Sequence, residues 1–250
     1  MSARKGVDLD WLIGLYTGDG SFSSHDVNTA HIALPSTAST LIERTRRTLR
    51  TLFQLEPSIK EHDGCSDLLI HSADFVDNFR DWCGTDCYNK HLPPFASKSD
   101  AALAGLIDSD GFRGKNETVL TTVSGSLALQ VFNLHLTEKN YPSMRVHQSD
   151  YGFPHGATTY QIATSSGAWH YTRWWRYQGR DYYLMPIVSI KSRDYKGSVY
   201  NLSVQDQHAY LANGIICHNC TEGGILYGAG IHGVRFKEWL ESLENNGHSA

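Results

Sequence analysis

Two segments of this chain repeat one pattern. Residues 12–20 have the sequence LIGLYTGDG and residues 103–111 the sequence LAGLIDSDG, so that Asp19 and Asp110 stand 91 residues apart. Each segment is apolar, carries small residues four positions apart and ends in Asp-Gly. Self-similarity at a fixed spacing indicates a duplicated structural unit. The chain is therefore expected to fold into two related halves.

The stretches of chain after the two segments are also alike. After the first segment we expect, in order, a polar strand-like stretch (21–34), a helix (37–53), two short strands (near 57–60 and 67–71) and a helix (73–82). After the second we expect a strand (118–123), a helix (126–136), two strands (near 143–147 and 159–164) and a Trp/Tyr-rich helix (168–177). The predicted fold class is α+β, a pseudo-two-fold duplication of an αββαββα unit.

The repeated segments have a physical consequence if they form helices. Small residues on one helix face let two backbones approach below the usual interaxial distance of roughly 8–10 Å. Asp19 and Asp110 would then meet at adjacent helix C-termini, which carry partial negative charge. Such a carboxylate cluster is stable only with a cation, and oxygen ligands with room for water suit Mg²⁺. Metal sites flanking a phosphodiester can activate water and stabilise the leaving oxygen.

The two segments resemble the paired motifs of a LAGLIDADG homing endonuclease in its single-chain, two-motif form. The second differs from that motif by Ser109, and the first departs at Tyr16-Thr17-Gly18 but keeps Asp-Gly. The resemblance implies that Asp19 and Asp110 are metal-binding catalytic residues. It implies Mg²⁺ (or Mn²⁺) as cofactor, double-stranded DNA as partner and short 3′ overhangs as product ends. Asp108 would serve helix capping or packing. The alternative is a duplication without cleavage, as in maturases of this family or in a nucleic-acid-binding module that has lost cleavage.

A lysine precedes the second segment in the sequence NKHLPP, residues 89–94. Similar endonucleases bring a lysine in a Lys-x-x-Pro context to the active site. The resemblance therefore implies that Lys90 stabilises negative charge on the scissile phosphate or polarises the attacking water. An ordinary surface lysine is the alternative. In the second half, Arg180 and Lys191 are the nearest cationic candidates, and neither has the same context.

DNA recognition is expected from the strands, because a two-stranded ribbon fits the major groove. The candidates are polar residues of the expected strands and turns: His25, Asn28, Thr29, His31, Arg113, Lys115, Asn116, Thr118, Arg145, His147 and Gln148. A solvated sheet face is the alternative for each of them. Four arginines (Arg44, Arg46, Arg47 and Arg50) are expected as solvated charge on an outer helix, and Trp169, Trp174 and Trp175 as core. The formal charge of −4 does not by itself indicate nucleic-acid binding.

The last part of the chain has a different sequence pattern. Short β-type runs are expected at 187–190, 199–204 and 209–216, and residues 218–220 are His-Asn-Cys. The Asn219 amide can attack its own carbonyl carbon and expel the amine of Cys220, while His218 donates a proton. The freed Cys220 thiol can attack an ester or thioester.

Residues 199–220 as a whole resemble the C-terminal splicing segment of an intein, which has a Hint-type β fold. The resemblance implies that His208 assists cleavage, that Asn219 cyclises and that Cys220 begins the downstream host protein. Asn201 stands where related inteins commonly carry Asp. We expect an endonuclease over 1–182 (halves 6–92 and 98–180), the splicing segment over 183–219 and the host start over 220–250.

An intein N-terminal nucleophile and a Thr-x-x-His element do not precede the first repeated segment. A split intein, whose N-terminal fragment is a separate partner chain, is the favoured explanation. A fragment of a longer protein and a decayed splicing segment are the alternatives.

Five cysteines, no signal peptide and no apolar run of about 20 residues predict a cytoplasmic protein without a membrane partner. Cys83 and Cys87 could form half of a zinc site, but no second pair with zinc spacing follows, so two free thiols are expected.

Overall fold

A computed structural model of the chain describes residues 3–137, 140–149, 156–165, 173–177, 179–184, 192, 194–198, 209–212 and 215–218. The chain divides into two compact units, Met1–Ala168 and Trp169–Ala250. The first unit contains both repeated segments. Among the residues described, no helix is long and apolar enough to cross a membrane.

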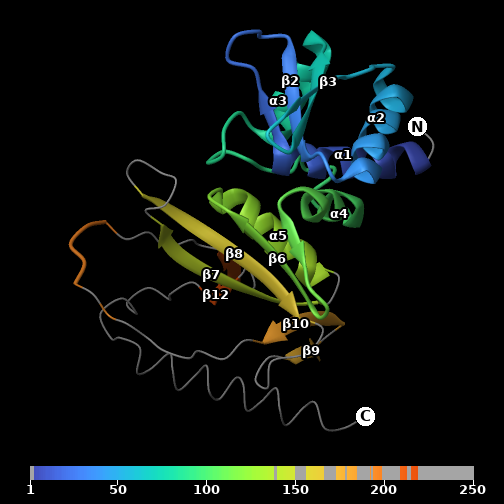
Figure 1. Cartoon of the computed structure of the whole chain (residues 1–250). Helices are drawn as coiled ribbons and strands as arrows, with labels where there is room; N and C mark the ends of the chain where they lie inside the picture. The colour runs from blue at the N-terminus through green and yellow to red at the C-terminus, as the bar shows by residue number, and fades with distance from the viewer. Residues whose placement is uncertain are drawn as a thin grey trace. The chain divides into compact units, whose positions relative to one another are not determined.

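The first half of the larger unit pairs three helices with one antiparallel sheet (Figure 1). Its elements are α1 (Ala3–Asp19), β1 (Gly20–Phe22), β2 (Thr29–Pro35), α2 (Ser39–Phe53), β3 (Ser58–His62), β4 (Cys65–His71) and α3 (Ala73–Cys83). The strands lie in the order β1-β2-β4-β3. Every helix and strand that the sequence predicted here is present, and the stretch expected over 21–34 forms the antiparallel β1–β2 hairpin.

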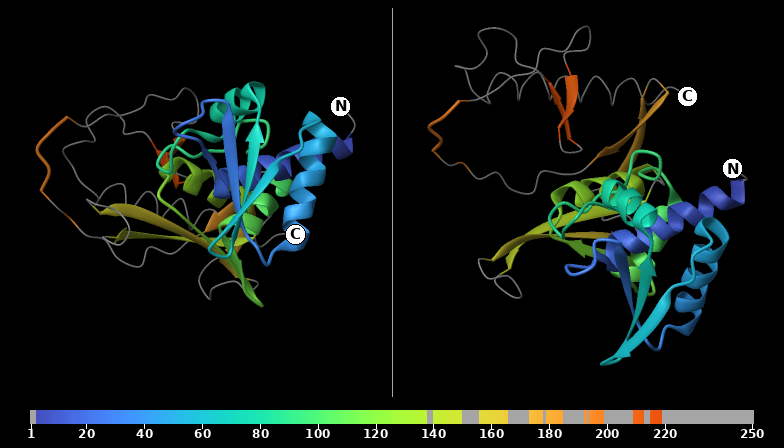
Figure 2. Two further views of the ribbon diagram at one scale, coloured as in Figure 1. Left: turned by 45° about the horizontal axis from the view of Figure 1, so that its top comes forward. Right: turned by 90° about the horizontal axis from the view of Figure 1, so that it is seen from above.

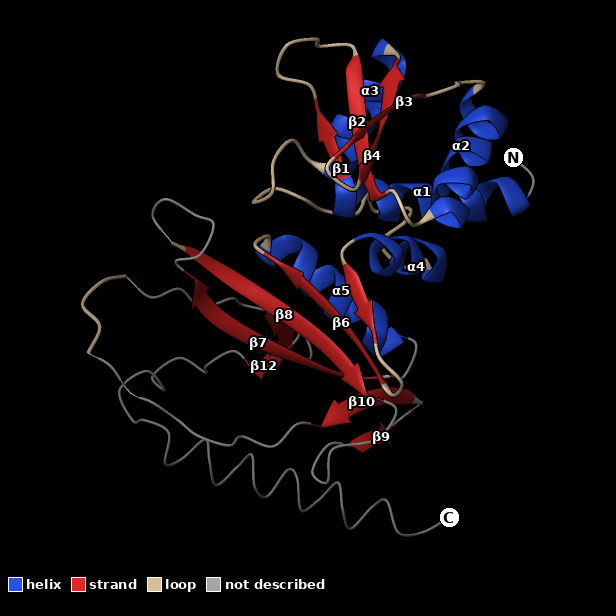
Figure 3. Ribbon diagram, in the orientation of Figure 1, coloured by secondary structure: helices blue, strands red, loops and turns tan. Residues whose placement is uncertain are grey.

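The second half repeats this arrangement. Its elements are α4 (Asp100–Ser109), β5 (Gly111–Arg113), β6 (Glu117–Thr122), α5 (Gly125–Thr137), β7 (Tyr141–Ser149) and β8 (Ala157–Ser165). The strand order β5-β6-β8-β7 matches that of the first sheet position by position. Helix α5 crosses one face of this sheet (Figure 3). The predicted α+β duplication is therefore confirmed over the described part of the first unit.

The prediction of a helix over 168–177 is wrong for residues 173–177, which are the part of this range that the structure describes. Arg173–Tyr177 is strand β9, which pairs antiparallel with β10 (Arg180–Leu184). Tryptophan and tyrosine favour strands over helices, and Gly179 between the strands adopts a positive φ of 75°, which suits a tight hairpin turn. Residues 166–172 lie outside the described part of the chain.

Helices α1 and α4 lie side by side, and their backbones nearly touch (Figures 1 and 2). A Cβ atom added at Gly14 would lie 1.9 Å from the carbonyl oxygen of Ala102, and one at Gly105 would lie 2.0 Å from that of Trp11. No side chain larger than hydrogen fits at either position. The small residues thus allow the close helix contact that their spacing predicted.

The first half has an aromatic core that accounts for its departure from the repeated pattern. The Tyr16 ring packs edge-on against Phe79 with centroids 4.9 Å apart, and Phe79 stacks on Phe75. The Tyr16 hydroxyl donates to the carbonyl oxygen of Ser21 at 2.8 Å, so its polar end is satisfied. A tyrosine in this place therefore fills the core.

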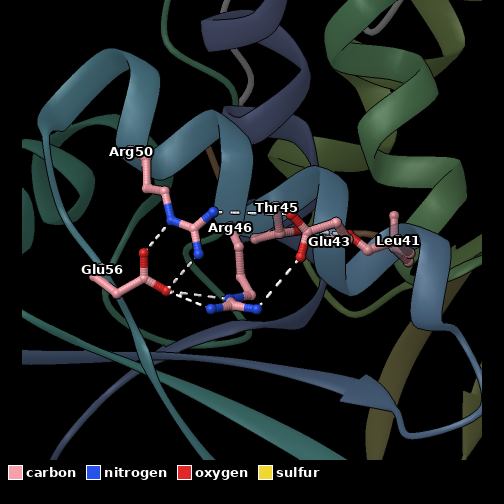
Figure 4. A network of polar contacts seen from close by, with 6 residues as sticks. All are labelled: Leu41, Glu43, Thr45, Arg46, Arg50 and Glu56. Carbon is pink, nitrogen blue, oxygen red and sulfur yellow. Dashed lines mark hydrogen bonds and ion pairs between the residues drawn. The ribbon is translucent and has the colours of Figure 1, made fainter.

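Two arginines of α2, Arg46 and Arg50, form ion pairs on its surface (Figure 4). Arg46 and Arg50 both donate to the carboxylate of Glu56, and Arg46 also donates to Glu43. Arg44 behaves differently, since its guanidinium lies 3.7 Å from the centroid of the Trp11 ring. The expectation of solvated charge is therefore wrong for Arg44, because α2 packs against α1 at this point.

In the second unit, β11 (Ala209–Ala212) and β12 (Ile215–His218) form an antiparallel pair. These strands confirm the β structure predicted over 209–216 for the described residues 209–212 and 215–216. The expected strands at 187–190 and 199–204, and residues His208, Asn219 and Cys220, lie outside the described residues.

Candidate active site

Two carboxylates come together where α1 and α4 end. Asp19 is the last residue of α1, and Asp110 directly follows the last residue of α4. Burial, the negative charge of Asp110 and a hydrogen bond with the Asp110 carboxyl group raise the pKa of Asp19 to about 7, while the charge of Lys90 opposes this rise. Asp19 therefore retains a proton at mildly acidic pH, and the pair has a strong affinity for positive charge.

Lys90 lies at the same place. Its ammonium group donates to the carbonyl oxygen of Gly18, the residue before Asp19 in α1. The last carbonyl groups of a helix have no partner within the helix, and a cation there is favourable. The structure thus brings Lys90 next to Asp19, and partly buries it, although 71 residues separate the two in sequence.

Asp108, the other acidic residue of the second repeated segment, points elsewhere. Its carboxylate accepts hydrogen bonds from Trp11 Nε1 at 2.9 Å and from Arg113 Nη2 at 2.9 Å. These contacts join α1, α4 and β5. Asp108 therefore has the packing role that its position in the pattern implied.

The donor set of the Asp19–Asp110 pair fits a hard divalent cation. Both side chains offer oxygen, and no third His, Cys, Asp or Glu completes a cluster in the part of the chain that the structure describes. Mg²⁺ keeps several waters and needs only one or two protein carboxylates besides phosphate oxygens. The two carboxylates thus suffice for Mg²⁺ bound together with a phosphate group.

Cys83 and Cys87 lie in different surroundings. Cys83 is buried in the core, which raises the pKa of its thiol to about 12, whereas Cys87 is exposed. Both are free thiols and form no disulfide.

The first sheet has one buried face and one polar face. Ala30, Ile32 and Leu34 are buried on the helix side, so the alternate residue His31 faces outward. His31 Nδ1 lies 2.8 Å from Asp67 Oδ2 on the neighbouring strand. Thr29 differs from the other candidates, because it is buried and its hydroxyl contacts Asp26 and His71. His25 and Asn28 lie in the exposed β1–β2 loop.

The candidate DNA-binding residues of the second sheet lie on different faces of that sheet. The buried residues Leu120 and Ile162 mark the inner face, so Arg145 and His147 lie on the outer face. Arg113 and Thr118 share the inner side with Leu120, and Arg113 is paired with Asp108. Gln148 also lies on the inner side, and it donates to Thr158 at 2.9 Å. Lys115 and Asn116 are exposed in the β5–β6 turn.

The outer faces also present polar residues that the sequence did not single out. Their cross-strand register places Lys60 and His62 beside the Asp67 strand, and Thr121 and Gln161 beside Arg145. The alternation of each strand could have suggested them. Which strands neighbour each other could not be known from the sequence.

The fold and the carboxylate pair define a duplicated α+β protein with an acidic centre at the ends of two packed helices. Residues 6–84, which span most of the first half, match the family model described as "LAGLIDADG-like domain". The first half is thus similar to a LAGLIDADG-like domain over these residues, and the second half repeats the strand order of the first.

Two curated proteins are similar to this chain. The ATP-dependent DNA helicase Hel308 of Thermococcus kodakarensis is 27% identical over 242 residues, which cover 83% of this chain and 21% of the helicase. DNA topoisomerase 1 of Pyrococcus furiosus is 48% identical over 46 residues, 18% of this chain and 4% of the topoisomerase. The chain thus spans about a fifth or less of the length of these relatives.

Among solved structures, I-DmoI in complex with DNA and Mn is 15% identical and has a TM-score of 0.46. The similarity covers 64% of this chain and 90% of that one.

Proposed function

We propose that this chain is a site-specific, Mg²⁺-dependent double-strand DNA endonuclease of the homing type. The observation that carries this proposal is the meeting of Asp19 and Asp110 at the ends of two packed helices, with Lys90 beside them. A purely structural duplication has no need for two carboxylates that repel each other at helix C-termini. The similarity to a LAGLIDADG-like domain over residues 6–84 supports the same function.

In this proposal each residue of the centre has its own role. Asp19 and Asp110 hold Mg²⁺, which when bound supplies charge stabilisation and an activated water for phosphodiester hydrolysis. Asp19 would have to be ionised to hold the cation, and its pKa is raised by burial and by the nearby negative charge of Asp110. Lys90 keeps a positive charge beside Asp19, where it stabilises negative charge that develops on the scissile phosphate.

DNA would lie along the outer faces of the two sheets, with the carboxylate centre at the contact between the halves. Outer-face side chains would contact base edges, the cations Lys60 and Arg145 among them would contact phosphate, and exposed loop residues would contact phosphate and sugar. The candidates retained are the exposed or outward residues: His25, Asn28, His31, Lys60, His62, Lys115, Asn116, Thr121, Arg145, His147 and Gln161. Thr29, Arg113, Thr118 and Gln148 are left out, because Thr29 is buried and the other three lie on the inner side.

The helicase relative supports an inserted element rather than helicase activity. The match covers most of this chain but only 21% of Hel308. A chain related to a limited segment of a DNA helicase is what an intein-borne endonuclease predicts.

The test is cleavage of a supercoiled plasmid library carrying random duplex inserts, with Mg²⁺ or Mn²⁺, followed by sequencing of the new ends. We expect a single recurrent site cut on both strands. Binding to one site without nicking in either metal would select the non-cleaving alternative, and cutting without any sequence preference would contradict the homing function.

A second function is favoured by the last described strands and the residues that come after them. We propose that 183–219 is an intein C-terminal segment and that 220–250 begins a host protein, with an N-terminal intein fragment as partner chain. His218 ends β12, and the sequence continues with Asn219 and Cys220. The test is release of the 31-residue tail when a matching N-terminal fragment is supplied, measured by mass spectrometry. Asn219→Ala should block release by cyclisation, and identical release from this variant would reject the mechanism.

A further inference from the structure

The segment that carries Lys90 has no regular secondary structure. It connects α3 to α4, and residues 84–93 form turns and irregular backbone. The position of the Lys90 ammonium group therefore depends on how the backbone of this segment is held. If catalysis uses Lys90, the residues that hold this backbone also matter for catalysis.

Local contacts shape the start of the segment. Gly84 has a positive φ of 83°, and a Cβ atom there would lie 2.3 Å from the carbonyl oxygen of Asn89. The Asp86 carboxylate accepts from the backbone amides of Tyr88 and Asn89. These contacts make a compact turn, but all of them lie within the segment, so they do not place it relative to Asp19.

Two side chains of the second half fix the segment from outside. Ser124 donates from its hydroxyl to the carbonyl oxygen of Lys90 at 2.6 Å. Gln130 of α5 forms two bonds with the backbone of Leu92, accepting from its N–H at 2.8 Å and donating to its carbonyl oxygen at 2.8 Å. Three hydrogen bonds from one helix and its N-terminus thus hold Lys90 and Leu92.

Ser124 is well suited to this role because it is itself rigid. It is fully buried, and its hydroxyl oxygen also accepts from the backbone N–H of Leu127 in the first turn of α5. A hydroxyl that caps a helix and donates to a distant carbonyl has a single orientation. At the other end, the Lys90 ammonium group reaches the carbonyl oxygen of Gly18 in α1.

We infer that Ser124 and Gln130 are positioning residues for Lys90, so that the second half sets the catalytic lysine of the first half beside Asp19. This inference rests on the proposed endonuclease function. It adds that the lysine is held from both halves: His91 N–H donates to the carbonyl oxygen of Cys83 in α3, and Ser124 and α5 supply the contacts from the second half. A purely structural role in joining the halves is the competing explanation.

The first experiment needs no cleavage. Lys90 in the full chain is labelled competitively with acetic anhydride, and its rate is compared by mass spectrometry with that of the exposed Lys60. We expect slow labelling of Lys90 in the wild type and a several-fold faster rate in Ser124→Ala and Gln130→Leu. Ser72→Ala is the matched control, since Ser72 caps α3 through Phe75 N–H as Ser124 caps α5. Unchanged labelling of Lys90 in both test variants would overturn the inference.

The second experiment uses the recovered DNA site and resolves the two strands. Ser124→Ala and Gln130→Leu should slow cleavage by roughly 10- to 100-fold, without weaker binding of DNA in Ca²⁺. We expect Lys90→Ala to slow cleavage of one DNA strand and to leave cleavage of the other strand intact. Both test variants should show the same strand preference. Ser124→Thr, which keeps the hydroxyl, should recover part of the rate. Combined with Lys90→Ala, neither test variant should cause a further loss. If the loss of cleavage rate in each double variant equalled the full sum of the two single losses, expressed as free energies, the inference would be overturned.

The two experiments separate the inference from the function on which it rests. Faster labelling of Lys90 in a protein that cuts no DNA would reject the endonuclease and keep the positioning of Lys90. Efficient cleavage together with unchanged labelling would keep the endonuclease and reject the positioning.

Discussion

Trp11 Nε1 donates to the carboxylate of Asp108 at 2.9 Å and so ties the first long helix to the second. The Arg44 guanidinium, which lies over the Trp11 ring, is 3.6 Å from the same carboxylate. Two residues further on, Asp110 leaves the helix and meets Asp19 instead. Two nearby carboxylates in one short segment therefore have different roles, one in packing and one in the acidic centre.

This difference can be tested by matched amide substitutions. Asp19→Asn and Asp110→Asn should each reduce cleavage on the order of 100-fold or more, because each removes a charged oxygen ligand from the centre. Asp108→Asn should retain most activity and lose some thermal stability. The measurement is single-turnover cleavage, with circular dichroism to confirm folding. Full cutting by both Asp19→Asn and Asp110→Asn would exclude the proposed metal site.

The raised pKa of Asp19 predicts a pH-dependent stability. The pKa of this group rises from 3.8 to about 7 on folding. The stability that its proton contributes is therefore fully present below about 3.8 and is lost as the pH rises towards 7. In the absence of metal, Asp19→Asn, which is always neutral, should be more stable than the wild type at pH 8, by about 2 kcal/mol given the partial exposure of Asp19.

Urea unfolding at pH 8 and pH 5 checks this prediction. The advantage of Asp19→Asn should shrink at pH 5, and Mg²⁺ should raise the stability of the wild type more than that of the variant. An equal difference at both pH values would mean that the acidic centre does not perturb Asp19.

The glycines of the helix contact predict a second stability effect. Gly14→Ala and Gly105→Ala should each destabilise the protein by about 1–3 kcal/mol, because the added methyl group meets the backbone of the facing helix. Gly6→Ala is the matched control in α1, since nothing lies within 4 Å of its Cβ position. It should stabilise the protein by about 0.5–1 kcal/mol through helix propensity. Equal effects at Gly6 and Gly14 in thermal unfolding would contradict the close packing.

The division of the surface predicts which cations contact DNA. Lys60→Ala and Arg145→Ala should each lower the slope of log affinity against log salt by about 1, as loss of one phosphate contact does. Arg46→Ala and Arg50→Ala should leave the slope unchanged, because these two arginines of α2 pair with Glu56, which follows the helix. Fluorescence anisotropy at several salt concentrations in Ca²⁺ measures the slope. If the Arg46 and Arg50 variants lowered the slope and the Lys60 and Arg145 variants did not, DNA would contact α2 instead.

Local patterns of this sequence predicted most of its elements. The strands after Asp19, strand β6 and the helices Ser39–Phe53 and Gly125–Thr137 appear close to where the sequence placed them, whereas the short strand β5 was not predicted. A further exception is Arg173–Tyr177, where a run of aromatic residues was expected to be helical and pairs as a strand. Propensity alone favours a strand there, and a partner strand across Gly179 provides the hydrogen bonds.

The sequence by itself determined the duplication, the order of the elements and the identity of the carboxylates at the helix ends, because each of these depends on residues that are close together in the chain. Only the tertiary structure decided which polar side chains share an outer face, why Arg44 turns inward to Asp108, and what holds Lys90. Those outcomes depend on contacts between residues far apart in the chain, such as Ser124 with Lys90 and Gln130 with Leu92. No local pattern encodes such contacts, since they exist only after both halves have packed.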